Sequence, residues 1–165
     1  DRMRSLVVYY SRTGNTRLVA EKIAQDLDAD IEEIIDKKDR GGIIGFIKGG
    51  LDAGRKKDTE IEEPENDPAD YDLVVVGTPV WAATVCPAIR TWLQRYGKTL
   101  KDVGFFLTTG GSGVEKTFNQ MAQVGKTTPH ETVAITVSEI NKDAWKSPTD
   151  EFVDELVAAV KARKS

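Results

Sequence analysis

The sequence predicts one doubly wound α/β domain, in which helices cover both faces of a five-stranded parallel sheet. Short apolar runs rich in β-branched and aromatic residues recur along the chain, and each is too short for an ordinary helix. Segments with helical spacing of apolar residues separate these runs. Apolar strands that alternate with helices are typical of a parallel sheet buried on both faces. With 165 residues, 39% of them hydrophobic, the chain has the length of a single domain spanning residues 1–165.

Five segments are expected to form strands, namely residues 6–10, 31–35, 73–76, 103–107 and 133–137. Four of them are strongly apolar. The second is weaker because Glu32 and Glu33 interrupt it, and this pattern suits an edge strand with one side in water. We therefore expect residues 31–35 to lie outermost in the sheet.

Four helices are expected from apolar residues at helical spacing. Their apolar positions are Leu18, Val19, Ile23 and Leu27; Ile89, Trp92, Leu93 and Tyr96; Phe118 and Met121; and Phe152, Val153, Leu156, Val157 and Val160. Pro87 and Pro148 fit first-turn positions, where a missing N–H is harmless. Ser147, three residues before Asp150, resembles a capping box for the last helix. Within the segment 37–62, Ile43, Ile44, Ile47 and Leu51 have helical spacing, but the pattern is weak because of the five glycines Gly41, Gly42, Gly45, Gly49 and Gly50.

Composition excludes several classes of function. The net charge of −4 is too mild for nucleic-acid binding, which normally needs a basic face. No apolar run approaches the length of a membrane span, and no secretory leader is recognised, so we expect a cytoplasmic protein with no membrane contact. One cysteine, Cys86, excludes an intramolecular disulfide, and one histidine, His130, excludes a histidine-rich metal site. We interpret Cys86 as a cap or packing residue and His130 as an exposed residue without an acidic partner.

A hydrogen-bonding turn follows the first strand directly. It consists of Ser11, Arg12, Thr13, Gly14, Asn15 and Thr16, and the helical pattern begins after it. A strand-to-helix turn gathers unpaired backbone N–H groups at the positive end of a helix, which favours an anion such as phosphate. The hydroxyl and amide side chains add further donors, and glycine allows a close backbone approach. We call residues 11–16 the phosphate loop. Neither a P-loop nor a G-x-G-x-x-G pattern follows the strand, so ATP and dinucleotides are disfavoured.

The phosphate loop resembles the S/T-x-T-G-x-T loop of the flavodoxin family, and the resemblance extends over nearly the whole chain. The resemblance implies a flavodoxin-like strand order of 2-1-3-4-5. It also implies that flavin mononucleotide (FMN) binds at the switch point outside the carboxyl ends of strands one and three, with its phosphate on residues 11–16.

The resemblance also implies two loops around the flavin ring. The first ring loop, residues 77–83, supplies Thr78, Pro79, Val80, Trp81 and Ala82, with Trp81 at the loop tip and its indole against the ring. The second ring loop, residues 108–113, offers its backbone to the pyrimidine edge through Thr109, Gly110, Gly111 and Gly113.

Two departures from the family pattern bear on function. The second ring loop has no aromatic residue, which leaves one face of the ring open to a second aromatic molecule. The charge is milder than in typical flavodoxins, and the basic residues Arg55, Lys56 and Lys57 are expected near the flavin.

We therefore expect an FMN-dependent electron-transfer protein with no catalytic acid or base and no metal, whose partner is a redox protein or a small aromatic electron donor or acceptor. The alternatives are an NAD(P)H- or quinone-dependent FMN oxidoreductase and a flavin-free phosphate-binding or interaction module.

Overall fold

The computed structural model describes residues 3–38 and 59–165, which contain a parallel sheet with the strand order β2-β1-β3-β5-β6. These strands are β1 (Ser5–Tyr9), β2 (Asp30–Glu33), β3 (Leu73–Trp81), β5 (Asp102–Thr109) and β6 (Glu131–Thr136). Counted along the parallel strands, this is the predicted order 2-1-3-4-5. The predicted edge position of the second strand is also confirmed, because β2 pairs with β1 alone among the described strands.

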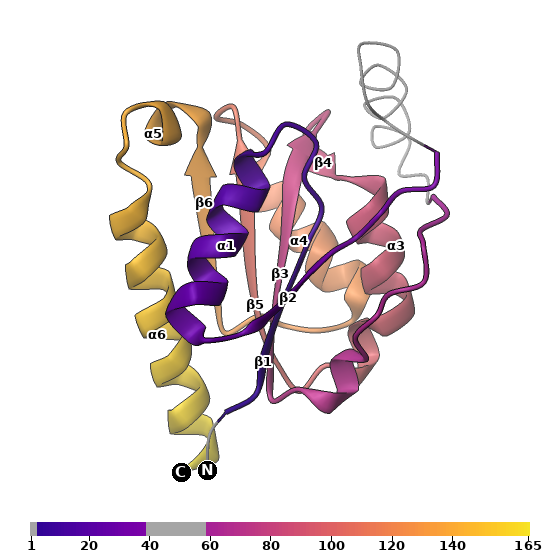
Figure 1. Cartoon of the computed structure of the whole chain (residues 1–165), viewed down its shortest axis with the longest axis vertical. Coiled ribbons are helices and arrows are strands. Elements are labelled where there is room, and N and C mark those ends of the chain that lie inside the picture. Colours follow the sequence, from indigo (N-terminus) through magenta and orange to yellow (C-terminus); the bar gives the residue numbers. More distant parts are fainter. Residues whose placement is uncertain (1–2, 39–58) are drawn as a thin grey trace.

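Helices cover both faces of the sheet (Figure 1). They are α1 (Asn15–Leu27), α3 (Pro87–Tyr96), α4 (Val114–Gly125), the short α5 (Val137–Asn141) and α6 (Lys146–Lys164), with single 3-10 turns η1 (Pro68–Asp70) and η2 (Gly97–Thr99). Helices α1 and α6 pack on one face, and α3 and α4 pack on the other. The alternation of strand and helix in the sequence therefore gives the predicted doubly wound arrangement.

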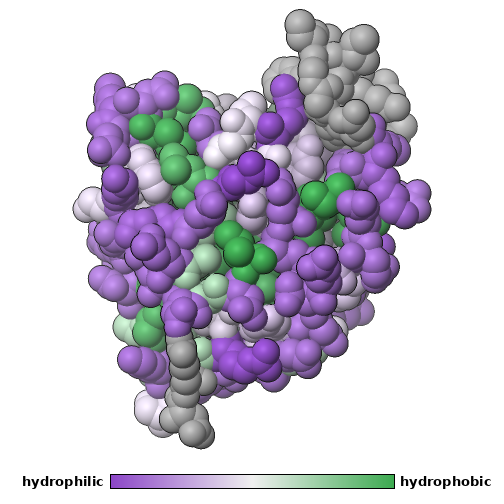
Figure 2. Space-filling model, viewed as in Figure 1, coloured by the Kyte–Doolittle hydropathy of each residue, from purple (hydrophilic) through white to green (hydrophobic). Residues whose placement is uncertain are grey.

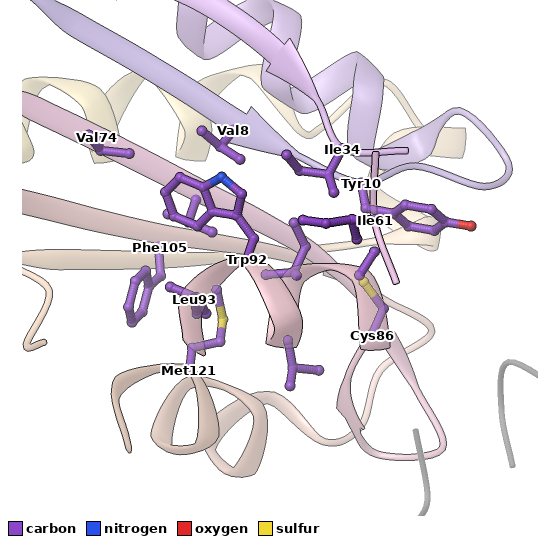
Figure 3. Packing of buried hydrophobic residues seen from close by; sticks show 14 of the residues in the cluster. Val8, Tyr10, Ile34, Ile61, Val74, Cys86, Trp92, Leu93, Phe105 and Met121 are labelled. Carbon is purple, nitrogen blue, oxygen red and sulfur yellow. The ribbon is translucent and has the colours of Figure 1, made fainter. Parts of the chain in front are cut away.

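The core has two halves because successive strand residues point to opposite faces of the sheet. On β1, Leu6 and Val8 pack towards α3 and α4, while Val7 and Tyr9 pack towards α1 and α6. Figure 3 shows the first half, in which sheet residues lie against Trp92, Leu93 and Met121 of these helices. Burial on both faces explains why these strands read as apolar runs without alternation.

The edge strand differs from the central strands in its exposure. Ile31 of β2 and Ile35 just after it are partly exposed, whereas Ile34 is buried. The face that carries β2 is largely hydrophilic, with only small hydrophobic areas (Figure 2). Beyond β2, Asp36 forms an antiparallel bridge with Ile61, so the acidic segment that begins at Glu60 returns along the sheet edge.

Several predictions at element ends were wrong. Strand β2 ends at Glu33 and not at Ile35, and β3 continues past Val76 to Trp81. Helix α6 begins at Lys146 with Trp145 at the N-cap and has no side-chain cap, so Ser147 lies inside the first turn beside Pro148. The Thr149 amide donates to the Trp145 carbonyl at 3.3 Å and the Thr149 hydroxyl donates to the same carbonyl at 2.7 Å, so the helix begins directly after Trp145. Val137 does not end the last strand but begins α5, where Thr136 and Glu139 form a capping box.

Some predictions fall outside the described residues. The weak helical pattern in residues 39–58 and the placement of Arg55, Lys56 and Lys57 near the flavin belong to this group. Within the described ranges, no helix has both the length and the apolar character needed to cross a membrane.

The sheet edge opposite the strand carboxyl ends carries a buried acid with two basic partners. Asp102, at the start of β5, is 1% exposed, and its two carboxylate oxygens accept hydrogen bonds from Arg163 of α6, both at 2.6 Å. His130 Nε2 lies 2.7 Å from Asp102 Oδ1, so His130 has an acidic partner, contrary to the sequence interpretation. The hydrogen bonds from Arg163 hold the pKa of Asp102 below its ordinary value.

Replacement of Arg163 by glutamine is expected to destabilise the protein most near neutral pH. Because the folded-state pKa of Asp102 is depressed, this ion pair stabilises the fold above the unfolded-state pKa, and the stabilisation is lost as pH falls through the folded-state pKa. Thermal unfolding of Arg163→Gln and the parent between pH 7 and pH 3 should show a difference that shrinks towards acid. Lys161→Gln, which removes an exposed cation of α6, is the control and should show no such convergence. A constant difference across this range would exclude the ion pair as the cause.

Candidate functional site

The carboxyl ends of β1, β3 and β5 meet at the edge of the sheet where the predicted site residues gather, at the top of Figure 1. A cavity of about 310 Å³ opens there, lined by Arg12, Thr13, Asn15, Thr16, Pro79, Val80, Trp81, Thr108, Thr109, Gly110 and Val137. All of these except Thr108 and Val137 belong to the predicted site. Residues from three loops that are far apart in sequence therefore converge on one cavity.

The phosphate loop leaves the start of α1 open to an anion. Gly14 occupies the N-cap with φ 102°, a left-handed conformation that suits glycine, and no side chain caps the helix. The first helical hydrogen bond runs from Leu18 N–H to the Gly14 carbonyl at 3.0 Å, so the amides of residues 15–17 have no partner within the helix. The first turn contains no acidic residue. This helix end combines free N–H groups with the positive end of the helix dipole.

Ser11 shapes the loop from within. Its hydroxyl oxygen accepts the backbone N–H of Gly14 at 3.1 Å, which closes the turn. A Cβ atom at Gly14 would meet nothing within 4 Å, so the requirement for glycine there comes from the backbone conformation and not from packing. Ser11 and Gly14 do not line the cavity, but they fix the backbone of the residues that do.

A buried hydroxyl pair joins the phosphate loop to β5. Thr16 Oγ1 lies 2.8 Å from Thr108 Oγ1, and both side chains are buried. A hydroxyl donates one hydrogen bond and accepts two, so Thr108 can donate to Thr16 while Thr16 donates into the cavity. The sequence places Thr108 in the second ring loop but gives no sign that its side chain meets Thr16.

Among the described residues, Arg12 is the only charged side chain that lines the cavity, and its guanidinium carbon lies 6.0 Å from the Trp81 ring centroid. The other arginine near the loop, Arg17, is turned towards β2, where it forms hydrogen bonds of 2.9 and 2.8 Å with Glu33. Arg12 therefore supplies the positive charge at this cavity.

Trp81 is not at a loop tip as the sequence predicts, because it is the last residue of β3. It pairs with Thr84 of β4 (Thr84–Val85), a short antiparallel strand that the sequence analysis missed. Trp81 is 7% exposed, and its ring meets the Tyr10 ring edge-on, with centroids 5.5 Å apart and planes at 87°. Trp81 lines the cavity, and its stacking on a flavin ring stays a prediction.

The turn between β3 and β4 is strained. Ala82 and Ala83 have φ values of 51° and 61°, as in the two-residue hairpin turn that normally takes Asn-Gly. A left-handed conformation costs about 1–2 kcal/mol for a residue with a Cβ atom. Strain of this kind persists where surrounding contacts impose the conformation, and it clusters at functional sites.

Predicted residues away from the cavity lining have structural contacts. Thr78 is buried, donates its hydroxyl proton to the Pro79 carbonyl at 2.7 Å and accepts the Cys86 amide at 3.2 Å. Cys86 stands at the N-cap of α3 inside the core, and burial raises the pKa of its thiol to about 11. The packing role predicted for Cys86 is therefore confirmed. Ala82 lies in the strained turn.

The side chain of Thr109 fixes the second ring loop through two hydrogen bonds, and two glycines of this loop are exposed to solvent. Thr109 Oγ1 donates to the Ser112 carbonyl at 2.7 Å and accepts the Gly111 amide at 3.1 Å. Gly110 and Gly111 are exposed, and a Cβ atom on either would meet nothing within 4 Å. Gly113, at the N-cap of α4 with φ 78°, packs instead against Ala83 and Val80 of the hairpin.

A family model described as Flavodoxin matches residues 4–151. The chain belongs to the flavodoxin family. The flavoprotein from Lactobacillus acidophilus NCFM, solved in complex with FMN, is 25% identical with a TM-score of 0.69, covering 87% of this chain and 98% of that one. A candidate flavoprotein from Bacteroides eggerthii DSM 20697 is 19% identical with a TM-score of 0.70, covering 91% and 98%. The search of curated proteins gave no match.

The flavodoxin of Megasphaera elsdenii is 18% identical over 94% of this chain and 97% of that one, with a TM-score of 0.57, and at this identity the likeness concerns the fold. Family membership and the FMN complex of the Lactobacillus relative support the cofactor predicted from the sequence, FMN. The present chain fits that cofactor in two respects. Its phosphate loop leaves helix amides without a side-chain cap, and the adjoining cavity carries an aromatic wall, Trp81.

Proposed function

We propose that this flavodoxin binds FMN at the cavity between the phosphate loop and the two ring loops and carries electrons between other molecules. The observation that carries the proposal is the uncapped start of α1, which opens beside a cavity walled by Trp81. Bound FMN would supply reversible uptake and release of electrons, chemistry that no amino-acid side chain offers.

The residues of the phosphate loop would hold the FMN phosphate. The amides of residues 15–17 point from the helix end, and Thr13, Asn15 and Thr16 line the cavity with hydroxyl and amide donors. Arg12 would offset part of the phosphate charge. Because the remaining donors are uncharged, the loop would suit a single phosphate better than a pyrophosphate.

The ring loops would exclude water from the flavin and set its environment. Pro79, Val80 and Trp81 present apolar surface to the cavity, while Thr109 and Gly110 bring backbone groups to it. When an aromatic ring packs on another, the contact contributes about 0.5–1.5 kcal/mol to the binding free energy, in addition to the gain from burying apolar surface. Among the described residues that line this cavity, none carries a carboxylate, an imidazole or a thiol for proton transfer, which supports electron transfer.

A second candidate is an FMN oxidoreductase that reacts directly with NAD(P)H or a quinone. The open second ring loop favours it, because exposed Gly110 and Gly111 leave space for another aromatic molecule. The partner of an electron carrier would be a redox protein, and the partner of the oxidoreductase would be a small aromatic electron donor or acceptor.

Absorption spectra and turnover distinguish these functions. We expect the protein, mixed with FMN and gel-filtered, to retain flavin absorbance in about a one-to-one ratio. We expect it to oxidise NADPH far more slowly than about 1 s⁻¹, the low end of enzyme turnover, unless a flavoprotein reductase is added. Free FMN at the same concentration is the control. Rapid NADPH oxidation without a reductase would exclude the electron carrier and support the FMN oxidoreductase. Protein that emerges from gel filtration without flavin would favour a flavin-free phosphate-binding or interaction module.

A further inference from the structure

We propose that Gln120 of α4 is a positioning residue that sets the place of Trp81 by clamping the hairpin between β3 and β4. The inference rests on the proposed function, since it assigns to Gln120 control of the cavity wall that would meet the flavin. Gln120 does not line the cavity and lies outside both ring loops.

The clamp consists of two hydrogen bonds to one oxygen. Gln120 Oε1 accepts the backbone N–H of Val85 at 3.1 Å and the hydroxyl proton of Thr84. All three residues are buried, with Gln120 7% exposed. Thr84 and Val85 make up the whole of β4, so this one side chain holds both residues of the strand.

The held residues lie directly opposite the cavity wall. Thr84 is the cross-strand partner of Trp81, and Val85 is the partner of Val80. Trp81 and Val80 both line the cavity. A shift of β4 relative to α4 therefore moves two wall residues together.

The hairpin between β3 and β4 needs contacts from another element to keep the conformation of its turn. A two-residue strand forms too few ladder bonds to impose left-handed conformations on Ala82 and Ala83 by itself. Helix α4 supplies contacts at two points. Gly113 lies against the turn, where a Cβ atom would come within 2.9 Å of Ala83 Cα, and Gln120 lies two helical turns further along the same face.

The amide of Gln120 is half satisfied, which argues against simple packing. Both donors on β4 require an oxygen acceptor, so the amide orientation is fixed, and Gln120 Nε2 has no hydrogen-bond partner among the described residues. A buried polar atom without a partner is unfavourable, and its retention calls for a reason. The acceptor function of Oε1 towards β4 provides that reason.

The apoprotein tests the clamp without any flavin. The indole N–H resonance of Trp81 in a ¹H–¹⁵N spectrum can be identified among the three tryptophans with Trp81→Phe. We expect Gln120→Leu, which removes the acceptor, to shift or split this resonance. Gln120→Glu, which keeps acceptor oxygens, should restore it. Thr84→Val removes one donor without touching α4 and serves as the second variant if Gln120→Leu does not fold.

The matched control is Thr117→Val. Thr117 is fully buried on α4 one turn before Gln120, and its hydroxyl has no hydrogen-bond partner among the described residues. This near-isosteric change alters the same helix without altering the clamp, so the Trp81 resonance should stay in place.

With FMN bound, Gln120→Leu and Thr84→Val should each raise the FMN dissociation constant about three- to tenfold and shift the flavin midpoint potential, with the double variant little worse than either single one. An unmoved Trp81 resonance in both single variants, or an equal movement in Thr117→Val, would overturn the clamp. If the parent protein binds no FMN, the proposed function fails, and the Trp81 resonance of the apoprotein still decides whether Gln120 positions Trp81.

Discussion

Replacement of Thr16 by valine is expected to weaken FMN binding about ten- to a hundredfold while changing riboflavin binding far less, because a buried donor to a charged group contributes about 1–3 kcal/mol. Valine keeps the shape of threonine and removes only the hydroxyl. Thr16 lines the cavity at the first turn of α1, where the phosphate is proposed to bind, whereas riboflavin has no phosphate to lose. Fluorescence titration of the apoprotein with each ligand measures the two dissociation constants.

Two further variants separate the phosphate contact from the internal hydroxyl pair. Thr16→Ser retains the hydroxyl and should bind FMN nearly as the parent does. Thr108→Val breaks the 2.8 Å bond to Thr16 from the other side and leaves the Thr16 hydroxyl in place, so its loss of FMN affinity should be smaller. Equal losses for FMN and riboflavin in Thr16→Val would mean that Thr16 supports the site only through Thr108.

Gly97→Ala is expected to destabilise the fold by about 3 kcal/mol or more, or roughly 6–12 °C in the midpoint of thermal unfolding. A Cβ atom at Gly97 would lie 2.2 Å from the carbonyl oxygen and 2.4 Å from the Cα of Gly125, so the end of α3 would collide with the backbone at the end of α4. Backbone atoms cannot rotate away as a side chain does. Thermal unfolding of the apoprotein followed by circular dichroism measures the effect.

The control for this prediction is Gly110→Ala in the second ring loop. Gly110 has no positive φ, and a Cβ atom there would meet nothing within 4 Å, so the change should leave apoprotein stability close to that of the parent. The backbone at Gly97 is right-handed helical, with φ −53° and ψ −39°, so alanine adopts it without strain and the collision is the whole cost of the substitution. An unfolding midpoint for Gly97→Ala equal to that of Gly110→Ala would show that α3 and α4 can separate without loss.

The phosphate loop illustrates how much of the site could be predicted from contiguous residues. Ser11 to Thr16 stand directly between an apolar strand and a helix, and the structure opens that helix start towards a cavity. Residues from both predicted ring loops lie at the same sheet edge as the phosphate loop, because parallel strands bring their carboxyl ends together, although residues 77–81 of the first belong to β3. In each case the relevant signal lies within a few residues.

The position of Trp81 could not be predicted in the same way. The pattern around it suggests a loop, but the chain continues as a strand to Trp81 and returns through Thr84. Two alanines in the left-handed region give no sequence signal for a hairpin turn, since that conformation normally selects Asn and Gly. The hairpin depends on α4, which packs on it from elsewhere in the chain.

The sequence by itself determined the alternation of strands and helices, the edge position of β2 and the phosphate loop, because local backbone preference and apolar periodicity act over short stretches of chain. Only the tertiary structure decided which distant side chains meet. Thr16 and Thr108 are 92 residues apart, Arg163 and Asp102 are 61 apart, and Gln120 and Thr84 are 36 apart. Such pairs form because packing of the helices on the sheet places their polar atoms within hydrogen-bond distance, and no local pattern encodes that distance.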